Sequence, residues 1–199
     1  MCIFDLMKNF TLLIIILILI PINMNSQENK LPFFEIGDYP NQYSEANIVS
    51  RMIDGLGYRY HWATESLNEN DLSYTPSDDS RSTFELIEHI YSLSLAIVST
   101  FKGKEFESPQ EKYNYNELRK MTLENLKFVK NKLKKTDDFS KLNIMIGQGE
   151  NKITLPFWNH INGPISDAIW HSGQIVTNRR ASGNPINPKV NVFIGKNNE

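Results

Sequence analysis

The sequence predicts an all-α domain, a four-helix bundle with short extended segments before and after its last helix. Apolar residues recur at three- and four-residue spacings in four separate stretches, which is the period of an amphipathic helix. Capping patterns and glycines stand at the ends of these stretches. The connections between them are roughly ten residues or longer, which suits a bundle whose helices do not simply zigzag.

The first 26 residues are expected to be a secretory signal peptide. Lys8 precedes an apolar run over residues 10–20, and a polar exit follows, which is the layout of an export signal. The run is shorter than the about 20 apolar residues that span a membrane. We expect cleavage between Ser26 and Gln27 and a periplasmic or secreted protein. An uncleaved membrane anchor is the alternative, because Met24 is a poor residue for a cleavage site.

The rest of the chain has little net charge and no cysteine. The 199-residue chain carries a net charge of −2, and loss of the signal leaves this value unchanged because Asp5 and Lys8 leave together. A protein without a large electrostatic field is not expected to bind nucleic acid. Cys2 lies inside the signal, so the mature domain has no cysteine for a disulfide or a metal. About 170 residues are enough for one domain with a sizeable core.

Residues 27–43 are predicted to be a lead-in segment on the surface of the domain, since they contain two prolines and no sustained period. The domain itself covers residues 44–199. Its first helix is predicted over residues 44–67. Glycines 55 and 57 lie inside this helix at a cost of up to about 1 kcal/mol each, and they predict a close approach by a neighbouring helix or a ligand.

The second and third helices begin at capping boxes. Ser82 and Glu85 form the first box, and Gly103 marks the end of the second helix. Asn114 and Glu117 repeat the pattern at the start of the third helix. That helix has a lysine-rich face, which we expect to be solvated.

Extended segments are predicted on both sides of the fourth helix. Residues 142–146 and 152–155 flank a glycine-containing turn and are predicted to form a hairpin. Residues 163–164, Gly-Pro, predict the start of the helix, and Gly183 predicts its end. Residues 190–194 alternate in polarity and form one more extended segment that could pair with the hairpin.

Histidines and a carboxylate on the second and fourth helices are candidate metal ligands. His89 shares the apolar face of the second helix and should point into the bundle. Asp167 and His171 are four residues apart, hence on one face of the fourth helix, and Gln174 and Asn178 extend the same line. Three such ligands can hold a divalent metal and leave a coordination position open. Two imidazoles and a carboxylate suit zinc, iron, nickel or manganese.

The residue types alone also allow a simpler interpretation. A histidine on an apolar face can be a core residue with an ordinary hydrogen bond, and Asp167 can be a first-turn charge that favours the helix dipole. His160 is expected to be a surface residue or a hydrogen-bond partner of the ligands, and His61 to be half-exposed packing.

Arginines near an open metal position could hold a substrate carboxylate. Arg59 lies on the first helix, and Arg179 and Arg180 end the fourth. Bidentate binding of a carboxylate suits a guanidinium. A solvated helix end that complements the dipole is the simpler interpretation.

Three segments resemble the DinB/YfiT-like superfamily: residues 54–60 (DGLGYRY), 86–91 (LIEHIY) and 158–175 (WNHINGPISDAIWHSGQI). The resemblance covers the chain after the signal and implies a four-helix bundle. It also implies a metal site built from one histidine of the second helix and an H-x-x-x-H pair on the last. His89 and His171 stand at matching positions, whereas Asp167 replaces the first histidine of the pair.

The resemblance implies a metal-dependent enzyme of the transferase, isomerase or hydrolase type that acts on a small-molecule substrate. The expected cofactor is a divalent metal ion, zinc or nickel first and iron or manganese second. The alternative is a non-catalytic metal-binding or interaction module of the cell envelope, because a fold alone does not set function. A homodimer through a helix face is compatible with either function.

Overall fold

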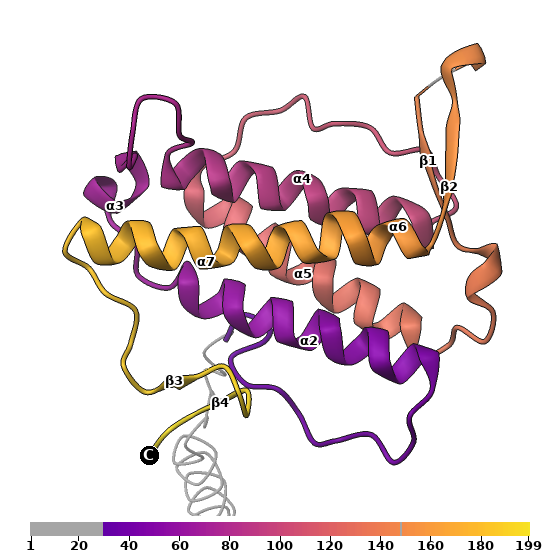
Figure 1. The fold of residues 1–199 in the computed structure, drawn as a ribbon, viewed down its shortest axis with the longest axis horizontal. Coiled ribbons are helices and arrows are strands. Elements are labelled where there is room, and N and C mark those ends of the chain that lie inside the picture. The colour runs from indigo at the N-terminus through magenta and orange to yellow at the C-terminus, as the bar shows by residue number, and fades with distance from the viewer. Residues whose placement is uncertain (1–29, 148) are drawn as a thin grey trace, which may run out of the picture. The chain divides into compact units, whose positions relative to one another are not determined.

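The computed structural model describes residues 30–147 and 149–199, and in these residues the fold is mainly helical (Figure 1). Residues Leu31–Glu199 form one compact unit. The prediction of an all-α fold is confirmed at this level. The predicted signal peptide, residues 1–26, lies outside the described residues.

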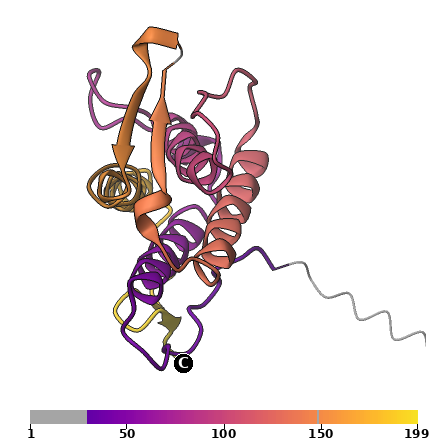
Figure 2. The same ribbon diagram turned by 90° about the vertical axis from the view of Figure 1, so that its right-hand side faces the viewer.

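The unit contains four long helices: α2 (Glu45–Ala63), α4 (Thr83–Phe101), α5 (Tyr115–Leu133) and α7 (Ser166–Ala181). Helices α4 and α2 each pack against both α5 and α7, and Figure 2 shows the helices end-on, around a shared interior. Helix α2 ends four residues before the predicted limit at residue 67. The interior is filled by apolar side chains that are almost wholly buried, among them Ile53, Leu56, Ile87, Ile90, Ile97, Leu123, Leu126, Leu133, Ile165 and Ile175.

Helix α4 is long and apolar enough to cross a membrane by length and composition alone. Half of it is buried inside the fold, and it packs along α5 and α7. Its hydrophobicity is therefore accounted for by its place in the core.

The predicted helix caps are confirmed. Ser82 accepts a hydrogen bond from the backbone N–H of Glu85 at 3.2 Å, and the Glu85 carboxylate accepts one from the backbone N–H of Ser82 at 2.7 Å. Asn114 and Glu117 form the same box at α5, at 3.1 and 2.9 Å. Gly103 has a φ of +62° just after α4, in the left-handed region that suits glycine. On α5, most of the predicted lysine face is exposed.

The predicted hairpin is present, but the tail pairs elsewhere. Strands β1 (Asn143–Ile146) and β2 (Ile153–Pro156) are antiparallel. In the tail, β3 (Val190–Asn191) pairs with β4 (Lys196–Asn197), so the prediction that the tail pairs with the first hairpin is wrong. The chain reverses near Gly195, whose φ of +74° closes a local hairpin instead. Short helical turns complete the described part of the chain: α3 (Glu69–Ser73), η1 (Phe139–Lys141) and η2 (Gly149–Asn151).

A short helical segment that was not predicted precedes the last helix. Helix α6 (Trp158–His160) and the π turn η3 (Ile161–Ile165) lead directly into α7, as Figure 1 shows. Gly163 departs from helical geometry, with φ −99° and ψ −106°, and Pro164 has no N–H to donate. A wide turn accommodates both residues inside the helix. The predicted start at residues 163–164 thus lies at this kink, two residues before α7 begins, and the end before Gly183 is confirmed.

The lead-in segment explains one of the two glycines of α2. A Cβ atom at Gly57 would lie 2.4 Å from Cγ of Phe33, which is far too close for a real side chain. The predicted close approach at Gly57 is confirmed, but the neighbour is the lead-in segment rather than a helix or a ligand.

Hydrogen bonds hold the same segment along α2. Nδ1 of His61 lies 2.8 Å from the carbonyl oxygen of Pro32, and the indole N–H of Trp62 donates to the carbonyl oxygen of Phe34 at 3.0 Å. Ile36 is buried beside Trp62. His61 is thus buried, not half-exposed as predicted, because the lead-in covers it.

Candidate metal centre

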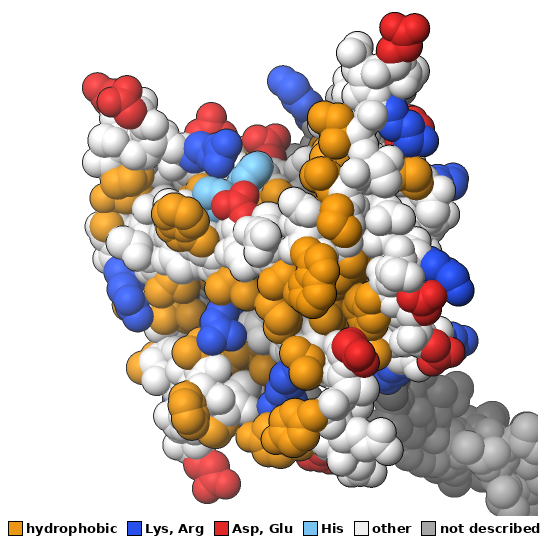
Figure 3. Space-filling model, turned by 45° about the vertical axis from the view of Figure 1, so that its right-hand side comes forward, with side chains coloured by type: hydrophobic (Ala, Val, Ile, Leu, Met, Phe, Trp, Pro, Cys, Tyr) orange, Lys and Arg blue, Asp and Glu red, His pale blue; other side chains and the backbone are white. Residues whose placement is uncertain are grey.

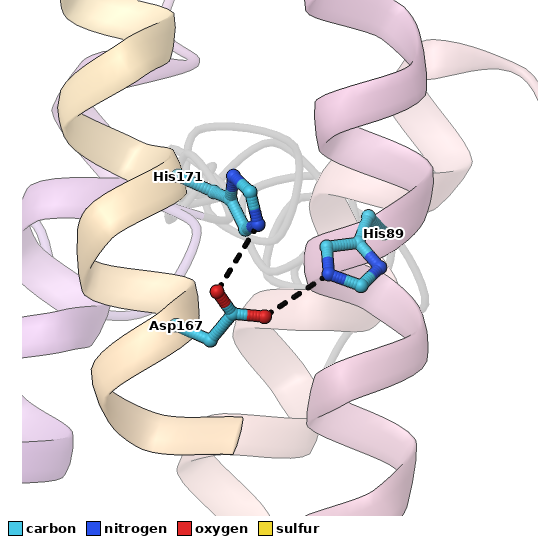
Figure 4. A group of neighbouring side chains, drawn as sticks. All are labelled: His89, Asp167 and His171. Carbon is cyan, nitrogen blue, oxygen red and sulfur yellow. Dashed lines mark hydrogen bonds and ion pairs between the residues drawn. The ribbon is translucent and has the colours of Figure 1, made fainter. Parts of the chain in front are cut away.

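The three predicted ligands come together in the groove between α4 and α7. Nε2 of His89 lies 3.1 Å from Oδ2 of Asp167, and Nε2 of His171 lies 3.2 Å from Oδ1 of the same carboxylate. The two imidazole rings are 4.8 Å apart, centre to centre, at an angle of 81°. Figure 4 shows the carboxylate lying between the two rings and reaching both. The sequence prediction that these three side chains meet is confirmed by the geometry.

The helices position these side chains in simple ways. Asp167 and His171 are one turn apart on α7, so both side chains leave the same face. Ala168 and Ile175 on the neighbouring face are buried in the core, which fixes the rotation of α7. His89 precedes the buried Ile90 on α4 and therefore lies at the edge of the buried face, next to the groove.

The three side chains are partly open to solvent. The side chains of His89, Asp167 and His171 are 29%, 35% and 12% exposed. Figure 3 shows histidine side chains beside an acidic side chain at the surface of the molecule. The expectation that His89 points into the bundle is therefore wrong, because α4 and α7 present both histidines at the rim of their interface.

Gln174 orients the ring of His171. Its Oε1 lies 2.6 Å from Nδ1 of His171. With this oxygen as acceptor, Nδ1 carries the proton and Nε2 directs its lone pair at Oδ1 of Asp167. A lone pair and a carboxylate oxygen 3.2 Å apart repel each other unless a cation, a proton or a metal ion, lies between them. The sequence placed Gln174 on the same helix face; its spacing of three residues from His171 was the signal for this contact.

The donor atoms suit a small divalent cation. One ligand atom from each of the three residues can be chosen so that all lie within 4.8 Å of one another. Ligand atoms around a tetrahedral zinc with bonds of about 2.0–2.2 Å lie roughly 3.3–3.5 Å apart. Each histidine Nε2 lies near this distance from one oxygen of Asp167, at 3.1 Å from Oδ2 for His89 and 3.2 Å from Oδ1 for His171. The group could therefore hold a metal ion with three protein ligands and a fourth position toward solvent.

The remaining histidine of the last helix has a different role. His160 is completely buried, and its Nε2 lies 2.8 Å from the hydroxyl oxygen of Thr100. Its Nδ1 has no hydrogen-bond partner among the described residues. Burial lowers the pKa of His160 to about 4, so the ring is neutral at pH 7. The expectation of a surface residue or a partner of the ligands is wrong, because α6 places this side chain in the core, against Thr100 of α4.

Arg179 stabilises the fold rather than forming a solvated helix end. Its guanidinium is buried and donates hydrogen bonds of 3.1 Å to the carbonyl oxygens of both Trp62 and Ala63 at the end of α2. It also donates to the carbonyl oxygen of Asn184 at 2.7 Å. Arg180, in contrast, is exposed.

Asn178 ends the predicted polar line without joining the ligands. Its side chain is buried, and its Nδ2 donates to Oγ1 of Thr83 at 3.2 Å. This contact ties α7 to the start of α4.

Comparisons of the chain with protein-family models, with curated proteins and with solved structures give no match.

Proposed function

We propose that this chain is an exported, DinB/YfiT-like metal-dependent enzyme in which His89, Asp167 and His171 bind a divalent metal ion. In this proposal the four long helices are the four-helix bundle of that superfamily. The observation that carries it is that one ligand atom from each of the three residues, on two helices, lies within 4.8 Å of the others, with Gln174 against the far nitrogen of the His171 ring.

The residues present fit zinc or nickel first. Two imidazoles and one carboxylate are ligands that both ions accept, and iron or manganese would follow. A divalent ion held there would supply Lewis acidity toward an oxygen of a small-molecule substrate. The chain contributes the orientation of the ligands and an approach from solvent between α4 and α7, which suits a transferase, isomerase or hydrolase type of reaction.

The exposure of the ligands favours an enzyme over a non-catalytic module. A structural metal site is closed, with every position filled by protein, whereas a catalytic site keeps one position open. Here the described residues offer three ligands, and up to about a third of each side chain is exposed. A module of the cell envelope would need a fourth protein ligand to close the site.

Elemental analysis of the purified protein tests metal binding directly. The protein is expressed from the full-length chain, without an affinity tag that binds metal, so that any processing of residues 1–26 proceeds naturally. We expect about one equivalent of a divalent ion, and an increase of about 5–10 °C in the melting temperature when zinc is present at 100 times its dissociation constant. His171→Ala should abolish both effects. If the purified protein takes up no divalent ion and zinc stabilises both proteins equally, the proposal is rejected.

The visible spectrum of a cobalt-substituted sample distinguishes a catalytic metal site from that of a non-catalytic module. Cobalt in an open site changes its visible absorption when azide is added, since azide takes the free position. A spectrum that does not change with azide would show a closed site and favour the non-catalytic module.

A further inference from the structure

A second candidate binding site lies on the face of α7 opposite to the metal ligands. Ile169, Val176 and Arg180 follow one another at seven- and four-residue spacings and so form one stripe of the helix, while Asp167 and His171 belong to the other side. A pocket of about 400 Å³ lies along this stripe, between α7, α2 and the C-terminal tail. This volume is within the range of small-molecule sites.

The pocket has apolar walls and two guanidinium groups. Ile169, Val176, Val190 and Val192 are among its apolar lining residues, together with Arg59 and Arg180. An adjoining pocket of about 560 Å³ shares Arg59 and Ile169 with it and continues toward exposed tyrosines of the lead-in. In Figure 3, hydrophobic side chains gather on this side of the molecule with basic side chains among them.

Gly55 positions the guanidinium of Arg59. Nη1 of Arg59 donates to the carbonyl oxygen of Gly55 at 3.0 Å, and a Cβ atom at residue 55 would lie 3.2 Å from the same nitrogen. The glycine, which costs the helix up to about 1 kcal/mol against alanine, thus leaves room for the guanidinium to lie against the helix backbone. This places Arg59 at the junction of the two pockets.

Both guanidinium groups are available to an anion. Among the described residues, every ion pair has a lysine or a histidine as its basic partner. No carboxylate of these residues lies within 4.0 Å of the guanidinium nitrogens of Arg59 or Arg180. Within the described residues, the side chain of Arg59 donates its hydrogen bond to the carbonyl oxygen of Gly55. A guanidinium beside an apolar wall suits a ligand with a carboxylate head and an apolar body.

Hydrogen bonds and packing hold in place the C-terminal tail that forms one wall of the pocket. The hydroxyl of Tyr58 donates to Oδ1 of Asn197 at 2.8 Å, and the backbone N–H of Ile36 donates to the carbonyl oxygen of Gly195 at 2.8 Å. Val190 also packs against the buried cluster that contains Ile36. The pocket is therefore preformed, which lowers the entropic cost of binding.

We propose that this pocket binds a small amphipathic carboxylate, such as a medium-chain fatty acid. The carboxylate lies on Arg59 and Arg180, and the chain lies along Ile169, Val176 and the valines of the tail. This site is separate from the metal ligands and stands whether or not a metal binds to them.

Calorimetric titration with octanoate tests the proposal. The purified protein should bind octanoate, and octan-1-ol, which has the same chain and no charge, should bind at least about tenfold more weakly, the loss expected for a charged hydrogen bond. Arg59→Gln should cause a similar loss. Arg81→Gln removes the same charge from an exposed position before α4 and should leave the affinity for octanoate unchanged.

Gly55→Ala separates a binding role from a structural one. The added Cβ requires Nη1 of Arg59 to shift by a few tenths of an ångström, so octanoate affinity should fall, while the melting temperature stays level or rises because alanine favours the helix. Equal binding of octanoate and octan-1-ol, or full affinity in Arg59→Gln, overturns the proposal. Octanoate binding that needs zinc and disappears in His171→Ala also overturns it, since the ligand would then bind at the metal ligands.

Discussion

The side-chain oxygen of Gln174 lies 2.6 Å from Nδ1 of His171, one helical turn along α7. This bond selects which ring nitrogen faces Asp167, and partners of this kind contribute strongly to metal affinity.

Replacing Gln174 by leucine is therefore expected to weaken zinc binding by about 10- to 100-fold, because the ring of His171 loses its acceptor and its fixed tautomer. Competition titration with a chromophoric chelator measures the change. Gln174→Glu keeps an acceptor oxygen at the same place and should retain the affinity. Equal affinity in wild type and Gln174→Leu would show that the bond has no role in binding.

Asp167 is expected to act as a ligand and not only as a first-turn charge. Asp167→Asn should reduce the metal content sharply, whereas Asp167→His, which restores the H-x-x-x-H pair, should retain it. Asp137→Asn is the matched control, since Asp137 is exposed and lies after α5, away from the groove. If Asp167→Asn binds zinc as well as this control, the carboxylate is not a ligand.

His160 should make the fold sensitive to acid. The pKa of His160 is lowered to about 4 in the folded protein by burial, against about 6.5 in an unfolded chain. Between these pH values the unfolded chain binds more protons, so stability falls as the pH drops, by up to about 3 kcal/mol in total. Unfolding in guanidinium chloride, measured between pH 7 and pH 4.5, gives this loss. The His160→Leu variant should lose correspondingly less stability over the same range. An identical pH dependence in both proteins would contradict the assignment.

Gly57 should tolerate no side chain. Gly57→Ala places a Cβ atom 2.4 Å from the ring of Phe33, and overpacking of this kind costs about 1–3 kcal/mol. Thermal unfolding should show a lower melting temperature. Gly173→Ala is the control, because a Cβ there meets nothing within 4 Å and should stabilise α7 by up to about 1 kcal/mol. A Gly57→Ala variant as stable as the wild type would mean that the lead-in does not pack on α2.

Local patterns in the sequence were enough to predict the four long helices and the helix face on which each ligand lies. The capping boxes at Ser82 and Asn114 and the glycine stop at residue 103 depend only on neighbouring residues. The spacing of Asp167 and His171 depends only on the helical repeat. Whether α4 and α7 lie side by side, so that His89 reaches the same carboxylate, is a long-range relationship that no local pattern contains.

The errors share one cause. His160 was expected at the surface or beside the ligands, and pairing of the tail with the first hairpin was considered, because local sequence does not show what covers a side chain or which strand lies nearest. His160 lies on α6 and packs against Thr100 of α4, and the lead-in covers His61 on α2.

By itself, the sequence determined the helical repeat, the caps and the residue types that a metal requires. The tertiary structure alone decided that the three ligand atoms converge, that the group is open to solvent, and that Arg59 stands over an apolar pocket on the other side of α7. The physical reason is that periodicity fixes the direction of a side chain relative to its own helix, whereas convergence depends on how separate helices pack against one another.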